Sequence, residues 1–146
     1  MHSRYANSTN FSRRVDAGLL VLRVAIGIVF LLHGGQKLFV FGLSGVAGFF
    51  GQMGAPMPGI TGPLVAIVEL LAGGALVIGL LTRLAALGLA IDMLGAILVL
   101  RLHAGFFLPA GGEFEFTLLA ANVAIAIAGA GYYSTDRVIA ERRAGR

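Results

Sequence analysis

Ionisable residues inside long apolar runs are the first candidates for chemistry in this chain. Arg23, Glu69 and Asp92 each stand within a stretch of aliphatic residues, and His33 and Lys37 follow in "FLLHGGQKLF" at the end of the first stretch. A charge near the centre of a bilayer costs about 2.5–3.5 kcal/mol on insertion scales, so such residues face a bundle interior or a polar cavity. These five residues are therefore candidate site residues.

Helical spacing predicts which of these groups meet. At a rise of ~1.5 Å per residue, Arg23 lies roughly 8 Å and Asp92 roughly 12 Å from the span end nearer the chain termini, which predicts a buried Arg23–Asp92 ion pair. Glu69, about 18 Å up, lies near the depth of His33 and Lys37, so we expect it to meet one of them. Each charged helix face also carries glycine or alanine, which favours inward packing.

Each candidate has a structural interpretation beside a functional one. His33 and Lys37 either anchor a helix at the membrane surface or form, with Glu69, a polar cluster that binds a ligand or relays protons. An Arg23–Asp92 pair can be purely structural. His33 and His103 are a pair of histidines able to ligate haem, although nothing else in the sequence marks a haem pocket.

Acidic and hydroxyl residues flank the last apolar run. Glu113 and Glu115 in "GGEFEF" are two residues apart and do not share one helical face. Thr117 lies close to the face of Glu113, so Glu113 is the predicted inward acid and joins the candidate ligand-binding residues. Ser134 and Asp136 are expected to end the last span and to cap a short helix, "TDRVIAERR".

The composition predicts a membrane protein. The chain has 146 residues, of which 58% are hydrophobic and only 12% charged, more apolar surface than a soluble domain of this size can bury. There is no cysteine, which excludes disulfides, a catalytic thiol, cysteine-ligated iron–sulfur clusters and c-type haem. No nucleotide-binding, hydrolase or metalloprotease motif occurs, and we expect no metal site.

Four apolar stretches are long enough, or nearly so, to cross a bilayer as helices. They cover about residues 17–38, 63–81, 84–102 and 114–132, with polar tails at 1–16 and 133–146. The link "LTRL" predicts a helical hairpin, and Val46–Met53 is expected to form a short helix in the membrane interface. The predicted fold is therefore all-α, an integral membrane four-helix bundle in a lipid bilayer.

The positive charges predict the orientation of this bundle. With four spans, both termini lie on the same side of the membrane. The opposite side then holds only two basic residues, Lys37 and Arg101. By the positive-inside rule we expect the termini in the cytoplasm and a multi-pass protein of the cytoplasmic (inner) membrane. Membrane orientation accounts for the net charge of +4, so we expect no nucleic acid as a partner. The arginines on the side of the termini are Arg4, Arg13, Arg14, Arg83, Arg137, Arg142, Arg143 and Arg146.

Taken together, these segments resemble the DoxX family. The similar stretches are "LRVAIGIVFLLHGGQKLF", "GVAGFFGQMGAPMPG", "VELLAGGALVIGLLTRLAAL", "IDMLGAIL" and "GGEFEFTLLAANVAIAIAGAGYYSTDR", within about residues 18–137. The resemblance is specific to this family because of the order and spacing of these stretches, not because of any single one of them. Asp92 departs from the resemblance, because many relatives are expected to be apolar there. The positions that match are site candidates only: Arg23, His33, Lys37, Glu69, Glu113, Ser134 and Asp136.

The resemblance implies a four-helix membrane protein with a redox role. Some family members belong to a thiosulfate:quinone oxidoreductase of sulfur-oxidising archaea, and a mycobacterial member is linked to a membrane oxidoreductase complex with superoxide dismutase and a sulfurtransferase. We expect a membrane subunit of a quinone-linked oxidoreductase complex in sulfur or redox metabolism. A quinone would be its cofactor, and its partner a soluble oxidoreductase or a second copy.

Two other functions stay open at this point. A non-catalytic membrane anchor or assembly factor for soluble partners would use the buried charges only to fix helix register. A small channel or transporter is a weaker alternative, because four short helices leave little room for a pore within one monomer.

Overall fold

The computed structural model describes the backbone of residues 2–145 and the side chains of residues 12–145. Within that part of the chain every regular element is helical and no strand occurs, so the all-α prediction is confirmed. Arg4 and Arg146, to which the sequence analysis assigned part of the positive charge, have side chains outside the described residues.

Six α-helices and two π-helical segments follow one another along the chain. The π-helical segments η1 and η2 continue helices α1 and α4 without a break. In order, the elements are α1 (His2–Gly35), η1 (Gln36–Phe41), α2 (Gly42–Gln52), α3 (Pro58–Ile78), α4 (Thr82–Ala96), η2 (Ile97–Arg101), α5 (Glu113–Ala128) and α6 (Thr135–Ala144).

Among the described residues, three helical stretches are long and apolar enough to cross a membrane: Ser12–Gln52, Pro58–Ile78 and Thr82–Arg101. The predicted fourth span, 114–132, corresponds to α5, which has 16 residues. This helix ends earlier than predicted because Gly129 adopts a φ of 87°, which L side chains rarely adopt and which stops the helix. Many large apolar side chains on all these helices point outward, as lipid-facing residues do.

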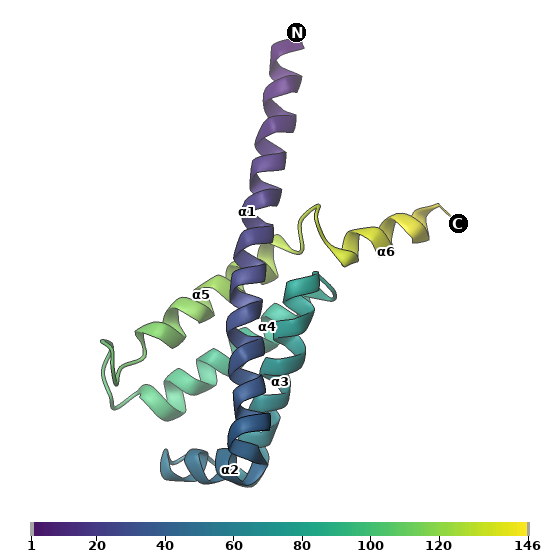
Figure 1. Cartoon of the computed structure of the whole chain (residues 1–146). Coiled ribbons are helices and arrows are strands. Elements are labelled where there is room, and N and C mark those ends of the chain that lie inside the picture. Colours follow the sequence, from purple (N-terminus) through teal and green to yellow (C-terminus); the bar gives the residue numbers. More distant parts are fainter. Residues whose placement is uncertain (1, 146) are drawn as a thin grey trace.

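The helices are arranged as two pairs. In Figure 1, α3 runs beside α1 and α5 runs beside α4, and the two pairs diverge away from the chain termini. Helix α2 lies across the end of the α1–α3 pair where the chain reverses. This agrees with the expected short helix at Val46–Met53, although α2 begins four residues earlier.

Glycines bring the backbones of α1 and α3 together. A Cβ atom at Gly34 would lie 2.4 Å from the Leu70 nitrogen, and one at Gly73 would lie 2.6 Å from the Leu31 nitrogen. Only glycine permits so close an approach, which is a common way to pack helices in lipid. The glycine-bearing faces predicted to point inward therefore do so, and the buried residues of these faces are Arg23, Gly27, Phe30 and Gly34 on α1 and Gly62, Ala66, Glu69, Gly73 and Leu76 on α3.

Candidate functional site

A cavity of about 460 Å³ lies where the two helix pairs diverge. Its walls come from α1, η1, α4, η2 and α5, with further residues from α2, the loop after it and the start of α3. Most of the wall is apolar, formed by side chains such as Phe30, Phe50, Val65, Val99 and Leu118. Five ionisable side chains also line it, and we call them the cavity cluster: His33, Lys37, Asp92, Arg101 and Glu115.

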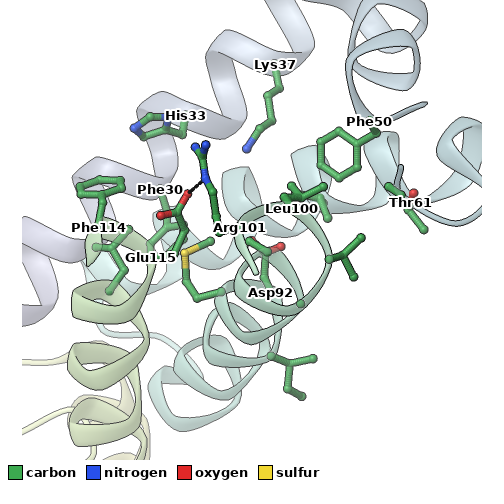
Figure 2. Close-up of a pocket in the computed structure, with 18 of the residues that line it drawn as sticks. Phe30, His33, Lys37, Phe50, Thr61, Asp92, Leu100, Arg101, Phe114 and Glu115 are labelled. Carbon is green, nitrogen blue, oxygen red and sulfur yellow. Dashed lines mark hydrogen bonds and ion pairs between the residues drawn. The ribbon is translucent and has the colours of Figure 1, made fainter. Parts of the chain in front are cut away.

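The two cations of the cavity cluster stand on the two π-helical segments. Lys37 lies in η1 and Arg101 is the last residue of η2. A π-helical turn shifts the register of the side chains that follow it, and such turns are frequent at functional sites. Figure 2 shows side chains from α1, η2 and α5 directed into the same space, with Arg101 reaching Glu115.

Lys37 forms an ion pair with Glu69 of α3. The Glu69 residue is only 3% exposed, whereas the Lys37 side chain keeps contact with the cavity. The expectation that Glu69 meets Lys37 or His33 is thus confirmed for Lys37. Glu69 itself does not line the cavity, so it acts on the cavity through its partner.

A second ion pair crosses from η2 to α5. The Nε atom of Arg101 donates to Oε1 of Glu115 at 2.8 Å, and its Nη1 donates to the Ala110 carbonyl at 3.1 Å. The prediction that Glu113 is the inward acid is wrong, since Glu113 is half-exposed and does not line the cavity. The spacing from Glu115 to the buried residues Leu118, Asn122 and Ile125 sets the inward face of α5.

The two histidines lie in different surroundings. The ring of His33 faces Phe114 with centroids 6.1 Å apart, and His33 lines the cavity. His103 is exposed in the loop after η2 and does not line it, so the structure does not support a haem held by the two histidines. Among the described residues no group of three or more His, Asp or Glu could hold a metal ion.

The predicted Arg23–Asp92 ion pair is not formed. Arg23 is 2% exposed and donates from Nη1 to the carbonyls of Leu76 at 2.7 Å and Val77 at 2.8 Å, and from Nη2 to the Tyr133 carbonyl. The carbonyl groups at the C-terminal end of α3 carry the negative end of the helix dipole and lack partners within the helix, which explains their preference for a guanidinium. Asp92 instead faces the cavity.

Arg23 belongs to a separate group of polar residues near the chain termini, which we call the terminal-side cluster: Asp16, Arg23, Ser134 and Asp136. The two carboxylate oxygens of Asp136 accept from the backbone nitrogens of Leu81 at 2.7 Å and Thr82 at 2.9 Å, which caps α4 from a distant segment. Asp16 accepts from the nitrogen of Tyr132 at 2.9 Å.

Ser134 caps helix α6, as the sequence predicted. It accepts from the backbone nitrogen of Arg137 at 3.3 Å, and its hydroxyl donates to the Gly131 carbonyl. Next to it, Gly79 ends α3 with a φ of 71°, and a Cβ atom there would lie 2.7 Å from Ser134 and 2.8 Å from Arg23. The terminal-side cluster therefore fastens the segment between α5 and α6 to the turn between α3 and α4.

These features define a helical membrane protein with an apolar cavity into which a few polar groups converge. The profile of the DoxX family matches residues 18–102, which is more than half of the chain. The chain belongs to the DoxX family, as the resemblance of its segments had indicated. No solved structure matches the sequence.

Relatives with curated names are similar over most of their length. A Bacillus subtilis (strain 168) protein named "Putative oxidoreductase CatD" is 32% identical over 125 residues, which are 86% of this chain and 89% of CatD. The membrane protein Rv3486 of Mycobacterium tuberculosis is 33% identical over 85% of this chain and 82% of its own. The inner membrane protein YqjF of Escherichia coli is 33% identical over 85% of this chain and 93% of its own.

Proposed function

We propose that this protein is the membrane subunit of a quinone-linked oxidoreductase and that the quinone binds in the cavity between the two helix pairs. The observation that carries this proposal is the cavity itself, about 460 Å³ with apolar walls and five convergent ionisable groups. Small-molecule sites have volumes of roughly 300–1,000 Å³, mostly apolar walls and a few placed polar groups. The name of CatD as an oxidoreductase supports the same direction.

The residues of the cavity fit a quinone ring. Aromatic side chains such as Phe30, Phe50 and Phe114 would cover the faces of a flat ring, and the five ionisable groups of the cavity cluster line the same cavity. A bound quinone would supply the capacity to accept and release two electrons and two protons. The contribution of this chain would be to bind and orient the ring and to hold polar groups near its oxygen atoms.

A partner protein would supply the electrons. The chain has no cysteine and, among its described residues, no cluster able to hold a metal, so a second protein must carry any metal centre of the complex. The soluble oxidoreductase expected from the sequence would occupy this role. The redox role in sulfur metabolism or in defence remains part of this proposal.

For the topology we propose four spans, with α5 as the fourth and both termini in the cytoplasm. Sixteen residues of helix reach about 24 Å, a little less than the roughly 30 Å of a bilayer core. The expected location is the inner membrane, as the name of YqjF suggests for that relative. The cavity would then open in the outer half of the bilayer.

The absence of cysteine makes this topology simple to test. Single replacements Ser12→Cys and Ser44→Cys place one thiol on each side, and both serines are exposed. A membrane-impermeant maleimide added to intact spheroplasts should label the Ser44→Cys variant and spare the Ser12→Cys variant until the cells are opened. The reverse pattern would contradict the orientation.

A cavity-filling substitution tests the binding proposal. Gly95 lines the cavity and a Cβ atom there meets nothing within 4 Å, so Gly95→Phe should fill the site without a clash. Gly88→Phe is the matched control on the same helix, because Gly88 also has open space around it and does not line the cavity. We expect decylubiquinone, measured by equilibrium dialysis of the detergent-purified protein, to bind at least tenfold more weakly to the Gly95→Phe variant and normally to the control.

The second candidate function is an anchor for soluble partners. Helix α6 favours it, because this basic helix has no buried residue and projects from the bundle in Figure 1. An anchor without redox function predicts a stable, folded protein to which decylubiquinone does not bind. The dialysis experiment on the wild-type protein therefore separates the two candidates.

A further inference from the structure

The charged groups of the cavity differ in whether they have an ion-pair partner. Lys37 is neutralised by Glu69, and Arg101 is neutralised by Glu115. Asp92 forms no ion pair or side-chain hydrogen bond with any residue whose side chain the structure describes. The cavity region therefore holds one acid more than its two cations balance, and that acid is Asp92.

Among the cavity-lining residues, the buried side-chain atoms that lack a hydrogen-bond partner are carboxylate oxygens. Oδ2 of Asp92 and Oε2 of Glu115 are both buried, and neither has a partner among the side chains and backbone of residues 12–145. Glu115 is only 9% exposed, and both residues line the cavity. A buried acceptor without a partner is rare in native proteins because it costs about 1–3 kcal/mol, so these two oxygens call for a donor.

We infer that the cavity recognises hydroxyl groups of its ligand, with Asp92 as the principal acceptor and Glu115 as the second, so that the hydroquinone form is bound in preference to the quinone form. This inference rests on the proposed function. A hydroquinone has two O–H donors, whereas a quinone has only carbonyl acceptors, whose lone pairs would face the lone pairs of the carboxylates.

The preference has a consequence for the redox couple in the site. A site that binds the reduced form more tightly makes the bound quinone easier to reduce than the free quinone. The equilibrium constant for reduction rises by a factor equal to the ratio of the affinities for the hydroquinone and the quinone. Lys37 and Arg101 would act as positioning residues here, because their ion pairs hold Glu69 and Glu115 in place. The cavity would then favour reduction of the quinone to the hydroquinone, with two electrons from the partner protein and two protons from water.

The test compares three probes that share one ring and one tail. Decylubiquinol has both hydroxyls, decylubiquinone has carbonyls in their place, and the bis-methyl ether of decylubiquinol has oxygen atoms without the O–H groups. Dissociation constants are measured by anaerobic equilibrium dialysis of the full-length protein in detergent, with protein-free micelles as the reference. For the wild type we expect the quinol to bind about tenfold more tightly than either other probe.

Two substitutions and a control assign the preference to Asp92. Asp92→Leu should reduce the preference for the quinol to about twofold or less, and Asp92→Asn should abolish or reverse it, because a carboxamide also offers N–H donors to a carbonyl. Glu113→Gln is the control, since Glu113 lies two residues from Glu115 and outside the cavity. This control should behave as the wild type.

The outcomes separate this inference from the proposal beneath it. If the wild type binds the quinone as tightly as the quinol, or more tightly, Asp92 is not an acceptor for a hydroxyl and the inference is overturned, while the quinone-binding function stands. If none of the three probes binds to the folded wild type, the proposed function itself fails. A quinol preference that survives both Asp92 substitutions would also overturn the role given to Asp92.

Discussion

The two polar clusters of this protein differ in the kind of group that each charge contacts. In the terminal-side cluster, Arg23, Asp16 and Asp136 all form hydrogen bonds with backbone groups of distant segments. In the cavity cluster, Lys37 and Arg101 form ion pairs with carboxylate side chains, although Arg101 also donates to the Ala110 carbonyl, and Asp92 has no partner among the described side chains. A charge that bonds to the backbone of a distant segment stabilises the fold. A charge that lies beside the cavity and bonds to another side chain can also contact a ligand.

This difference matters because both clusters satisfy the same sequence criterion. Each contains an ionisable residue within an apolar helix, the feature that usually marks function in a membrane. Burial is therefore no guide to which cluster is functional, since Arg23 is buried more deeply than Asp92. The clusters should separate when substitutions are tested for stability and for binding independently, and the following predictions are ordered by the size of the expected effect.

Replacement of Arg23 should have the largest effect on stability. Arg23→Met leaves the carbonyls of Leu76, Val77 and Tyr133 without their charged donor, and hydrogen bonds to charged groups contribute about 1.5–3 kcal/mol each, so we expect a loss of about 5 kcal/mol or more. SDS-induced unfolding in mixed micelles, followed by circular dichroism, measures it. Arg14→Met is the control, because Arg14 is exposed, and a loss at Arg23 no larger than that at Arg14 would contradict a fastening role.

The Lys37–Glu69 pair should show an asymmetric response. Lys37→Met leaves a carboxylate buried alone and should destabilise the protein by about 3 kcal/mol, whereas Glu69→Gln leaves a lysine whose side chain is 21% exposed and should have a smaller effect. The same unfolding assay on the double variant Lys37→Met/Glu69→Gln should recover most of the loss. A double variant as unstable as the sum of the single ones would mean that the two residues act independently.

The sequence predicted the helix faces well because glycine spacing and burial are coupled. On α1, the face of Arg23 was expected to carry small residues and to pack inward, and Arg23, Gly27 and Gly34 are all buried. The estimated depths left His33 and Lys37 open as partners of Glu69, and the structure pairs Glu69 with Lys37. These predictions depend only on the rise and turn of a regular helix, and α1 and α3 remain regular up to Gly35 and through Glu69.

Partners that depend on helix ends and crossing angles could not be predicted in the same way. The Arg23–Asp92 prediction compared depths but ignored the last carbonyl groups of α3, which Arg23 contacts instead. The choice of Glu113 over Glu115 used one neighbouring threonine. The apolar stripe through Leu118 and Ile125 would have pointed to Glu115, and Arg101, at the end of the preceding helix, would then have been its natural partner.

Removal of the cap at Asp136 should have an intermediate effect. Asp136→Ala leaves the backbone nitrogens of Leu81 and Thr82 without an acceptor, and loss of such a cap costs about 1–2 kcal/mol. Asp136→Asn retains one acceptor oxygen and should lose less. Thermal unfolding in detergent gives the ranking, and equal stability of the alanine variant and the wild type would show that α4 begins without help from α6.

Asp92 should have the smallest effect on stability, and its sign should be opposite to the others. Asp92→Leu removes a carboxylate that has no partner among the described side chains, so the protein should be unchanged or up to about 1 kcal/mol more stable in the unfolding assay. Asp92→Asn should behave in the same way. A loss of stability above about 1 kcal/mol in both variants would mean that Asp92 stabilises the fold, as Arg23 does in the terminal-side cluster. A stable variant that has lost its preference for the hydroquinone would instead explain why a carboxylate is present on this face of α4. Ligand recognition would then be the contribution that offsets the cost of desolvating this carboxylate.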